Sequence, residues 1–367
     1  MFSSNRSLAL ACLVLFIPRL ASAEEGQTPI TSLPAVITTN GSFFLDSSIA
    51  GTFVHTGPDP AITIQSGVKY VSIDLTDHII LVDPSGEGIF FEDTTHARVR
   101  NGAIIGGQHG VNWEYLSPSP STGSSPRHLL IEDFAALDMD YTGVRWKGIA
   151  APGEEFPGRE GRLVINDLVT GRTTSEVLPI GIDVERASMV WVDTFGSHEN
   201  SRHLILEDTF DVNLRGHIWN NPNAFGGIPS VQIRDGLPVV RMQSITAASM
   251  VHEQTFVPFL DLFESVDLFM RMVNLSATTS AKLESIEGHL AWNAFSRLDL
   301  GDAMPLYVHF NTFMVGFTDL YPWPSQVIWS RNSCPMQVRP DCWDWSVTWG
   351  LEPPAPVSDA SPYNNIP

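Results

Sequence analysis

Two short patterns of apolar and polar residues alternate along residues 70–220. The first places apolar residues at two alternate positions and follows them with one or two polar residues, the last of which is Asn or Asp. The second begins with Gly and a β-branched residue and reaches a large apolar residue two positions later. Alternation at every second position predicts β-strands whose first and third residues face inward. Copies of the first pattern are Val71–Asp74, Ala97–Asn101, Leu129–Asp133, Leu163–Asp167 and Leu204–Asp208. Copies of the second are Gly88–Phe91, Gly110–Trp113, Gly143–Trp146, Gly181–Val184 and a degraded Gly216–Trp219.

The spacing between copies predicts a coil of stacked turns. Equivalent apolar residues of the first pattern are separated by 26, 32, 34 and 41 positions and are Ile73, Val99, Ile131, Ile165 and Leu206. The shortest interval fits one bare turn of a three-sided coil, and the units are too short and too β-branched for helical repeats. The longer intervals contain Pro-, Ser- and Gly-rich inserts at Ser117–Pro126 and Ala150–Arg159, which we expect to project as loops from one corner. The predicted fold class is therefore all-β, a parallel β-helix or solenoid.

The polar residue that ends the first pattern predicts a corner of the coil. These residues are Asn101, Asp133, Asp167 and Asp208. Asn and Asp tolerate the left-handed backbone conformation that a tight bend between strands requires. This polar ladder, the inward Ile, Val and Leu, and the opening stretch Ile37–Leu45 together resemble the pectate-lyase-like right-handed parallel β-helix superfamily, over residues 37–221. The resemblance implies a right-handed coil but no single activity, since the superfamily includes lyases, hydrolases, epimerases, esterases, adhesins and phage spikes.

The beginning of the chain predicts export. The apolar run Leu8–Ile17 is too short for a membrane span, which needs about 20 apolar residues. It follows Arg6 and precedes the small-x-small stretch Ala21–Ala23, which is typical of a cleavage site. We therefore predict a signal peptide over residues 1–23 and a secreted protein, which is extracellular, periplasmic or bound at the cell surface.

The remainder of the chain is predicted to divide into three parts. The β-helix is expected over residues 24–245. Residues 246–352 are expected to form a C-terminal cap of mixed helix and irregular structure, with the helix within 247–274. Residues 353–367 are expected to be a flexible tail. Cys334 and Cys342 are expected to form a disulfide that pins the cap, because the predicted compartment is oxidising.

The charge of the chain limits its partners. The sequence has 21 Lys and Arg against 41 Asp and Glu, for a formal net charge of −20. This excess of acid argues against nucleic acid and anionic membrane surfaces as partners. A polyanionic glycan would need bridging Ca²⁺ or a local basic patch to bind. The sequence does not determine the oligomeric state.

Two rows of outward residues are the main candidates for chemistry. In the superfamily that the chain resembles, the strand before the variable loop lines the substrate groove, and here that strand is the second pattern. Equivalent outward residues of successive turns lie roughly 4.8 Å apart. One row consists of Phe90, Asn112, Arg145 and Asp183, and the other consists of Glu92, Glu114, Lys147 and Glu185.

These rows fit two reaction classes and one plain structural role. A β-eliminating lyase needs a base, here Arg145 or Lys147, and cations or Ca²⁺ to neutralise the substrate carboxyl. A hydrolase needs two carboxyl groups, one protonated and one ionised. In either case we expect the neighbouring residues to bind substrate or metal; they are Asn112, Glu114, Asp183, Glu185 and Phe90. Alternating charges also pair across neighbouring strands of a solvated sheet without any catalytic role.

Three further residues are candidate catalytic groups. His109 lies in the Gly-flanked turn before the second pattern and is either a catalytic group or a turn residue. Asp138 and Asp140 are two positions apart and form either a hydrolytic pair, a Ca²⁺ site or a solvated turn.

The aromatic residues divide into core and surface candidates. Trp113 and Trp146 are at inward positions and are expected in the core. Phe90 and Trp219 are candidates for exposed surfaces on which sugar rings stack. The C-terminal tryptophans are also candidates, or they pack the cap against the coil; they are Trp323, Trp329, Trp343, Trp345 and Trp349.

Two functions follow from these features as hypotheses. The first is a secreted glycan-active or glycan-binding β-helix protein, either a polysaccharide lyase or a glycoside hydrolase if it is an enzyme. The second is a non-catalytic extracellular adhesion or structural protein that uses the coil as a rigid spacer.

Overall fold

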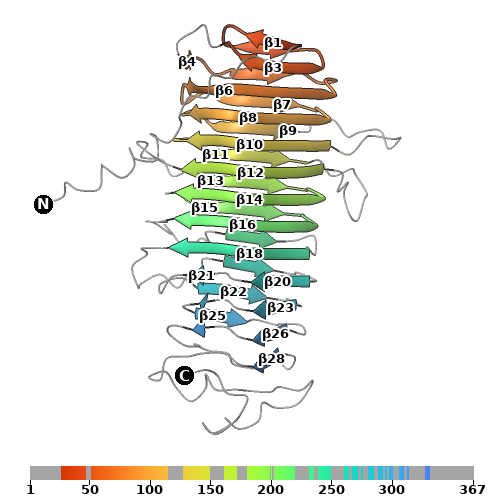
Figure 1. Ribbon diagram of the computed structural model, residues 1–367, viewed down its shortest axis with the longest axis vertical. Helices are drawn as coiled ribbons and strands as arrows, with labels where there is room; N and C mark the ends of the chain where they lie inside the picture. The colour runs from red at the N-terminus through yellow and green to blue at the C-terminus, as the bar shows by residue number, and fades with distance from the viewer. Residues whose placement is uncertain are drawn as a thin grey trace, which may run out of the picture.

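The structure is a computed structural model, and it describes a long stack of parallel β-strands (Figure 1). The described residues are 26–46, 51–114, 127–148, 161–171, 180–198, 200, 202–219, 231–234 and 239–248, and beyond these the strands between residues 260 and 330. The predicted signal peptide, both inserts, the Cys334–Cys342 disulfide and the tail lie outside the described residues, and so do Trp323, Trp343, Trp345 and Trp349.

The strands form two sheets, and the chain passes repeatedly from one sheet to the other. The first sheet has 17 described strands. They are β1 (Gln27–Ile30), β3 (Gly41–Leu45), β4 (Thr52–His55), β6 (Tyr70–Val82), β8 (His96–Ile105), β10 (Arg127–Leu137), β12 (Gly161–Gly171), β14 (Met189–His198), β16 (Asp211–Trp219), β18 (Val239–Ala248), β20 (Asp267–Arg271), β21 (Asn274–Leu275), β23 (Gly288–Ala291), β24 (Ala294–Phe295), β26 (Leu306–His309), β27 (Thr312–Phe313) and β28 (Val327–Ser330). The second sheet has 11 described strands. They are β2 (Ala35–Ile37), β5 (Pro60–Ile64), β7 (Glu87–Glu92), β9 (His109–Glu114), β11 (Thr142–Lys147), β13 (Ile180–Glu185), β15 (Arg202–Glu207), β17 (Val231–Arg234), β19 (Leu260–Phe263), β22 (Ser280–Glu284) and β25 (Arg297–Leu300).

Every described pairing is parallel and joins one turn of the coil to the next. In the first sheet β8 pairs with β10 and β10 with β12, and in the second sheet β9 pairs with β11 and β11 with β13. An all-β chain whose parallel strands alternate between two sheets is the arrangement of a parallel β-helix. The described residues contain no helix.

The long strands of the first sheet bend at one polar residue each. The backbone φ is +57° at Asn101, +47° at Asp133 and +60° at Asp167. Each of these residues interrupts the register of its strand, so that the two halves of the strand pair separately with the next turn. The predicted left-handed corner is confirmed at these three positions.

The repeat assignment is wrong at Leu204–Asp208. This segment lies in β15 of the second sheet, where Leu204 and Leu206 are in register with Ile182 and Val184. The first-sheet strand of that turn is β14, in which Val192 is in register with Ile165 and Thr194 has a φ of +56°. Asp208 also has a positive φ, of 53°, but it ends a strand of the other sheet. The alternation of apolar residues followed by Glu-Asp has the same form in both sheets, so the pattern alone could not separate them.

The assignment of Gly216–Trp219 is wrong for the same reason. This segment is the end of β16 in the first sheet, whereas the second-sheet strand that follows β15 is β17.

The strands continue past residue 245, the end of the coil that the sequence predicted. Within 247–274, where a helix was expected, the described residues instead belong to strands β18 to β21. Apolar residues at alternate positions, such as Leu260 and Leu262 or Leu268 and Met270, explain the strands, because short apolar runs are ambiguous between helix and strand. Parallel pairing extends to β28.

Aliphatic and aromatic side chains fill the interior of the coil. Ile73, Val99, Ile131 and Ile165 are fully buried at equivalent positions of successive first-sheet strands. Facing them, the second sheet contributes an aromatic stack in which the ring centroids of Trp113 and Trp146 are 4.9 Å apart. The prediction that these two tryptophans belong to the core is confirmed, since both are almost completely buried.

Candidate functional site

A column of glycines determines how closely the second-sheet strands approach one another. A Cβ placed on Gly110 would lie 2.6 Å from the carbonyl oxygen of Gly143, and one on Gly143 would lie 2.7 Å from that of Gly181. Distances under 3.0 Å are incompatible with a side chain, so only Gly fits at these positions without a shift of the backbone. The Gly of the second pattern is therefore a requirement of close packing between turns. It also fixes which of the following residues face outward.

The two predicted rows are confirmed in register. Asn112 is opposite Phe90 on one side and Arg145 on the other, and Arg145 is opposite Asp183. In the second row, Glu114 is likewise opposite Glu92 and Lys147, and Lys147 is opposite Glu185. Period-two alternation and a common glycine are sufficient to place these residues, which is why the sequence predicted them correctly.

The charges pair diagonally between the rows. Arg145 Nη1 donates to Glu114 Oε1 over 2.7 Å, and the two side chains are 26% and 25% exposed. Glu185 instead forms an ion pair with Arg186, at 2.7 Å. Lys147 is exposed and has no ion pair with any residue that the structure describes. Lys147 is thus an available cation on this part of the surface.

Glu87 is a member of the site that the sequence analysis missed. The side-chain amide of Asn112 donates to both carboxylate oxygens of Glu87, at 3.3 Å each. Burial raises the pKa of Glu87, and the charge of Glu114 raises it further, while the Asn112 hydrogen bond and Arg145 act in the opposite direction. Glu87 comes directly before the glycine of the second pattern, and a pattern that begins at the glycine leaves it out.

Asn112 is buried beneath the site and holds a neighbouring side chain in position. It is only 2% exposed, and its Oδ1 is buried without a hydrogen-bond partner among the described residues. A ligand that approaches this face would therefore meet Arg145 and Glu114 before Asn112. The observed contact indicates that Asn112 orients Glu87.

Asp183 lies on the other side of Arg145 and is also an unusual carboxyl. Burial raises its pKa, Arg145 lowers it, and the charges of Glu207 and Glu185 raise it again. Arg145 thus lies between two half-buried carboxyl groups, Glu87 and Asp183, whose pKa values are both raised by burial. Glu114, in contrast, is held in an ion pair with Arg145.

His109 is the first residue of β9 and is close to the same arginine. Burial lowers the pKa of His109 to about 4, and the positive charge of Arg145 contributes to the decrease. Its Nδ1 is buried without a partner among the described residues. The His109 ring is therefore neutral near pH 7, and it lies at the beginning of the strand that also bears Asn112 and Glu114.

Asp138 and Asp140 lie in the turn that leads into β11. Asp138 is buried and has a φ of +55°, whereas Asp140 is half-buried. The backbone N–H of Asp138 donates to the Gly171 carbonyl, and that of Asp140 donates to the Gly107 carbonyl. These bonds show a structural role for the turn. Arg145 is three positions beyond the start of β11, so the two aspartates are at the opposite end of this strand from the ion pair.

Phe90 is half-buried at the N-terminal end of the first row. Trp219 and Trp329 lie in strands β16 and β28, and the structure describes only their backbone.

Among the described residues, no group of three or more His, Cys, Asp or Glu is placed to hold a metal ion. The expected Ca²⁺ thus stays a prediction. No described helix has the length and apolar character needed to cross a membrane.

No known protein-family model, curated protein or solved structure matches this chain.

The mixed-charge face, defined as Glu87, Asn112, Glu114, Arg145 and Asp183, combines two kinds of carboxyl group. Glu114 forms an ion pair with Arg145, whereas Glu87 is half-buried, accepts hydrogen bonds from Asn112 and has a raised pKa because of its burial. A carboxyl group with a raised pKa near a second carboxyl group is a candidate arrangement for general acid and base catalysis.

Proposed function

We propose that this is a secreted protein that binds glycans and hydrolyses glycosidic bonds at the mixed-charge face. The observation that carries the proposal is the half-buried Glu87 carboxyl, which Asn112 holds by hydrogen bonds of 3.3 Å on the face that also bears the Arg145–Glu114 ion pair. Burial raises the pKa of Glu87, and the charge of Glu114 raises it further. Glycoside hydrolysis requires one carboxyl group that gives a proton and a second that is ionised. The resemblance to the pectate-lyase-like superfamily, with its right-handed coil and glycan-active members, supports the same proposal.

In the proposed reaction Glu87 protonates the glycosidic oxygen of the leaving sugar. Glu114 takes a proton from the water that attacks the anomeric carbon, so that both carboxyl groups have exchanged their protonation states after one turnover. Arg145 holds Glu114 in place through their ion pair, and Asn112 orients Glu87. Lys147 and Glu185 then bind sugar hydroxyls beside the scissile bond, with Phe90 offering an apolar ring to a neighbouring sugar.

A lyase would use the same face differently. It would need Arg145 or Lys147 to remove a proton, with cations or Ca²⁺ to neutralise the substrate carboxyl. Arg145 is engaged in an ion pair with Glu114, whereas Lys147 has no ion pair with a described residue, so Lys147 is the better base for this reaction.

The alternative function is that of a non-catalytic adhesion or structural protein. It is supported by the pairing of Glu114 with Arg145 and of Glu87 with Asn112, which gives both carboxyl groups a partner without a ligand. It is also supported by the length of the parallel stack, whose strands continue to residue 330.

A panel of polysaccharides incubated with the mature protein, with and without Ca²⁺, tests these functions. New reducing ends without absorbance of unsaturated uronates support hydrolysis. Reducing ends accompanied by that absorbance show a lyase, and no product from any glycan supports the spacer. Arg145→Ala should lose activity, and Asp193→Asn is the matched control because Asp193 is an outward carboxylate of the first sheet, paired with Arg215.

A further inference from the structure

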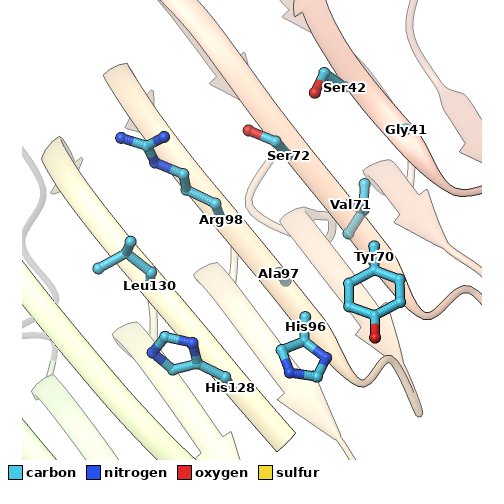
Figure 2. Close-up of a pocket in the computed structure, with 10 residues that line it drawn as sticks. All are labelled: Gly41, Ser42, Tyr70, Val71, Ser72, His96, Ala97, Arg98, His128 and Leu130. Carbon is cyan, nitrogen blue, oxygen red and sulfur yellow. The ribbon is translucent and has the colours of Figure 1, made fainter.

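A second surface with unusual chemistry lies on the outer face of the first sheet. Figure 2 shows a shallow hollow there, formed by strands β3, β6, β8 and β10. Two lines of outward side chains border it, and each contributes one residue per turn. One line is Ser42, Ser72 and Arg98, and the other is Tyr70, His96 and His128.

The second line continues onto the next turn, and we call it the histidine row: Tyr70, His96, His128 and Arg162. Each residue is in register with the next along the coil. The Tyr70 ring stacks on His96 with centroids 4.9 Å apart and an interplanar angle of 20°. The rings of His96 and His128 form a T-shaped pair, with centroids 6.4 Å apart and an interplanar angle of 87°. Along the axis of the coil, the Tyr70 ring is thus followed by three basic side chains, those of His96, His128 and Arg162.

Nearby carboxylates are engaged by other arginines. Glu132 is paired with Arg98 and Asp93 is paired with Arg127, the latter at 2.9 Å. The Arg100 guanidinium likewise lies 2.9 Å from Asp74.

The basic side chains of the histidine row have no carboxylate partner of this kind among the described residues. No ion pair joins His96, His128 or Arg162 to a residue that the structure describes. Like charges directly opposite one another on adjacent strands are destabilising. In agreement with this, burial lowers the pKa of His128, and the charges of His96 and Arg162 lower it further. The chain has a net charge of −20, yet this row of basic side chains has no acidic partner among the described residues. A bound anion would offset the repulsion between them.

The other features of the hollow suit a sugar ring. Tyr70 is 57% exposed, so part of its ring remains open to a ligand. Ser42 and Ser72 are half-buried beside it, and neither hydroxyl has a hydrogen bond to a described residue. An aromatic ring next to hydroxyl donors and acceptors recognises the apolar face and the hydroxyl groups of a pyranose. An inorganic anion has no sugar ring and would therefore not stack on Tyr70.

We propose that the histidine row and the adjoining hollow form a second glycan site, which binds an acidic oligosaccharide along the axis of the coil. One sugar ring stacks on Tyr70 with its hydroxyls at Ser42 and Ser72. Carboxylate or sulfate groups of the following sugars bind His96, His128 and Arg162. The site is on a different sheet from the mixed-charge face, and it does not depend on the activity proposed there.

Binding at this site should strengthen as the pH falls, because a bound anion favours the protonated form of His128, whose pKa burial and the neighbouring charges of His96 and Arg162 lower in the free protein. The other titratable and charged groups around the two histidines are Lys69, Tyr70 and Asp74 next to or on β6, Asp93 before β8, Arg98 and Arg100 on β8, Arg127 and Glu132 on β10, and Arg162 on β12. The carboxylates in this set lie beside arginines. Histidine is the side chain whose ordinary pKa lies in the interval between pH 5 and 7.5.

Isothermal titration calorimetry with oligosaccharides of equal length tests the proposal. The probes are an oligogalacturonate, a sulfated oligosaccharide and a neutral oligosaccharide, each measured at pH 5.0 and 7.5. We expect at least one acidic probe to bind about tenfold more tightly at pH 5.0, and the more tightly bound one identifies the anionic group. His96→Ala/His128→Ala should abolish the pH dependence, and Tyr70→Ala should weaken binding about tenfold. Asp193→Asn, which lies in β14 outside both sites, should bind as the wild type does.

Several outcomes would overturn the proposal. They are equal affinity for the neutral and acidic probes, affinity that does not change with pH, and wild-type binding by both the double histidine variant and Tyr70→Ala. Loss of binding in Arg145→Ala alone would assign the ligand to the mixed-charge face instead. Competition by inorganic sulfate as strong as that by the sulfated probe would show anion binding without recognition of sugar. Circular dichroism of each variant confirms that it is folded.

Discussion

Arg145 donates to Glu114 over 2.7 Å, and this contact joins two successive turns of the second sheet. The same guanidinium influences groups on both sides: it opposes the raised pKa of Glu87 and of Asp183 and contributes to the lowered pKa of His109. One arginine therefore influences the pKa of three neighbouring residues. Such coupling among titratable groups is typical of functional sites, although structural ion pairs also produce it.

Removal of this arginine should change the titration of His109 in a known direction. In Arg145→Ala the nearby positive charge is lost, so the pKa of His109 should rise above its value of about 4. Burial is the larger cause and remains, so the pKa should stay below that of an ordinary histidine. NMR titration of the His109 ring measures the change. Arg98→Ala is the control, because Arg98 is on the other sheet and should leave His109 unaffected.

His109 should also make the stability of the protein depend on pH. Its folded pKa of about 4 is lower than the ordinary value of 6.5, so the folded state favours the neutral ring. The resulting stability is complete above pH 6.5 and is lost as the pH falls from 6.5 through 4. A difference of this size between folded and unfolded pKa corresponds to about 3 kcal/mol. Urea unfolding of His109→Asn between pH 4 and 7 should show a shallower loss than the wild type. If the free energy of unfolding changed with pH in the same way for both proteins, the role of His109 would be refuted. Thr142→Ser is the control, because it changes a neighbouring residue that has no titratable group.

The Trp113–Trp146 stack should be a major source of stability. Trp146→Ala removes a ring that is 2% exposed and leaves a cavity in the core, so we expect a loss of about 3–5 kcal/mol in the free energy of unfolding. Tyr141→Ala is a suitable control, because Tyr141 directly precedes the same strand and its side chain is 58% exposed. This variant should lose less than about 1 kcal/mol in the free energy of unfolding. Chemical denaturation followed by tryptophan fluorescence and circular dichroism measures both. An equal loss in the two variants would contradict the stack's role.

The glycine column should tolerate no side chain. In Gly143→Ala the new Cβ would lie 2.7 Å from both the Gly181 carbonyl oxygen and the Thr170 side chain, so the two turns must separate. We expect a loss of about 1–3 kcal/mol in the free energy of unfolding. Gly196→Ala provides the matched control, because its nearest neighbour would be at an ordinary 3.6 Å. If thermal denaturation showed the two variants to be equally stable, the close approach of the strands would be wrong.

The sequence predicted the part of the fold that depends on local pattern. Asn101, Asp133 and Asp167 reveal the bend of the long strands because few other residues adopt a positive φ. The glycine of the second pattern reveals the register, and with it the positions of Asn112 and Arg145. These features are encoded within five or six consecutive residues.

The errors concern features that depend on contacts between distant residues. Leu204–Asp208 has the form of a first-sheet strand, and only its pairing with β13 shows that it belongs to the second sheet. The role of Glu87 depends on Asn112, 25 positions away in the chain, which no local pattern connects to it. The diagonal pairing of Arg145 with Glu114 likewise follows from side-chain conformation and cannot be read from register alone.

The most direct test of the proposed function is the pH dependence of glycan hydrolysis by the wild type and Glu87→Gln. We predict that the wild type releases reducing ends and loses activity as the pH rises through the raised pKa of Glu87, because the acid must be protonated. Glu87→Gln keeps the shape of the side chain but has no proton to give, so its rate should fall by about 10²- to 10⁴-fold without the loss at high pH. Asp193→Asn should match the wild type. Hydrolysis by Glu87→Gln at the wild-type rate, or no hydrolysis of any glycan by the wild type, would contradict the account.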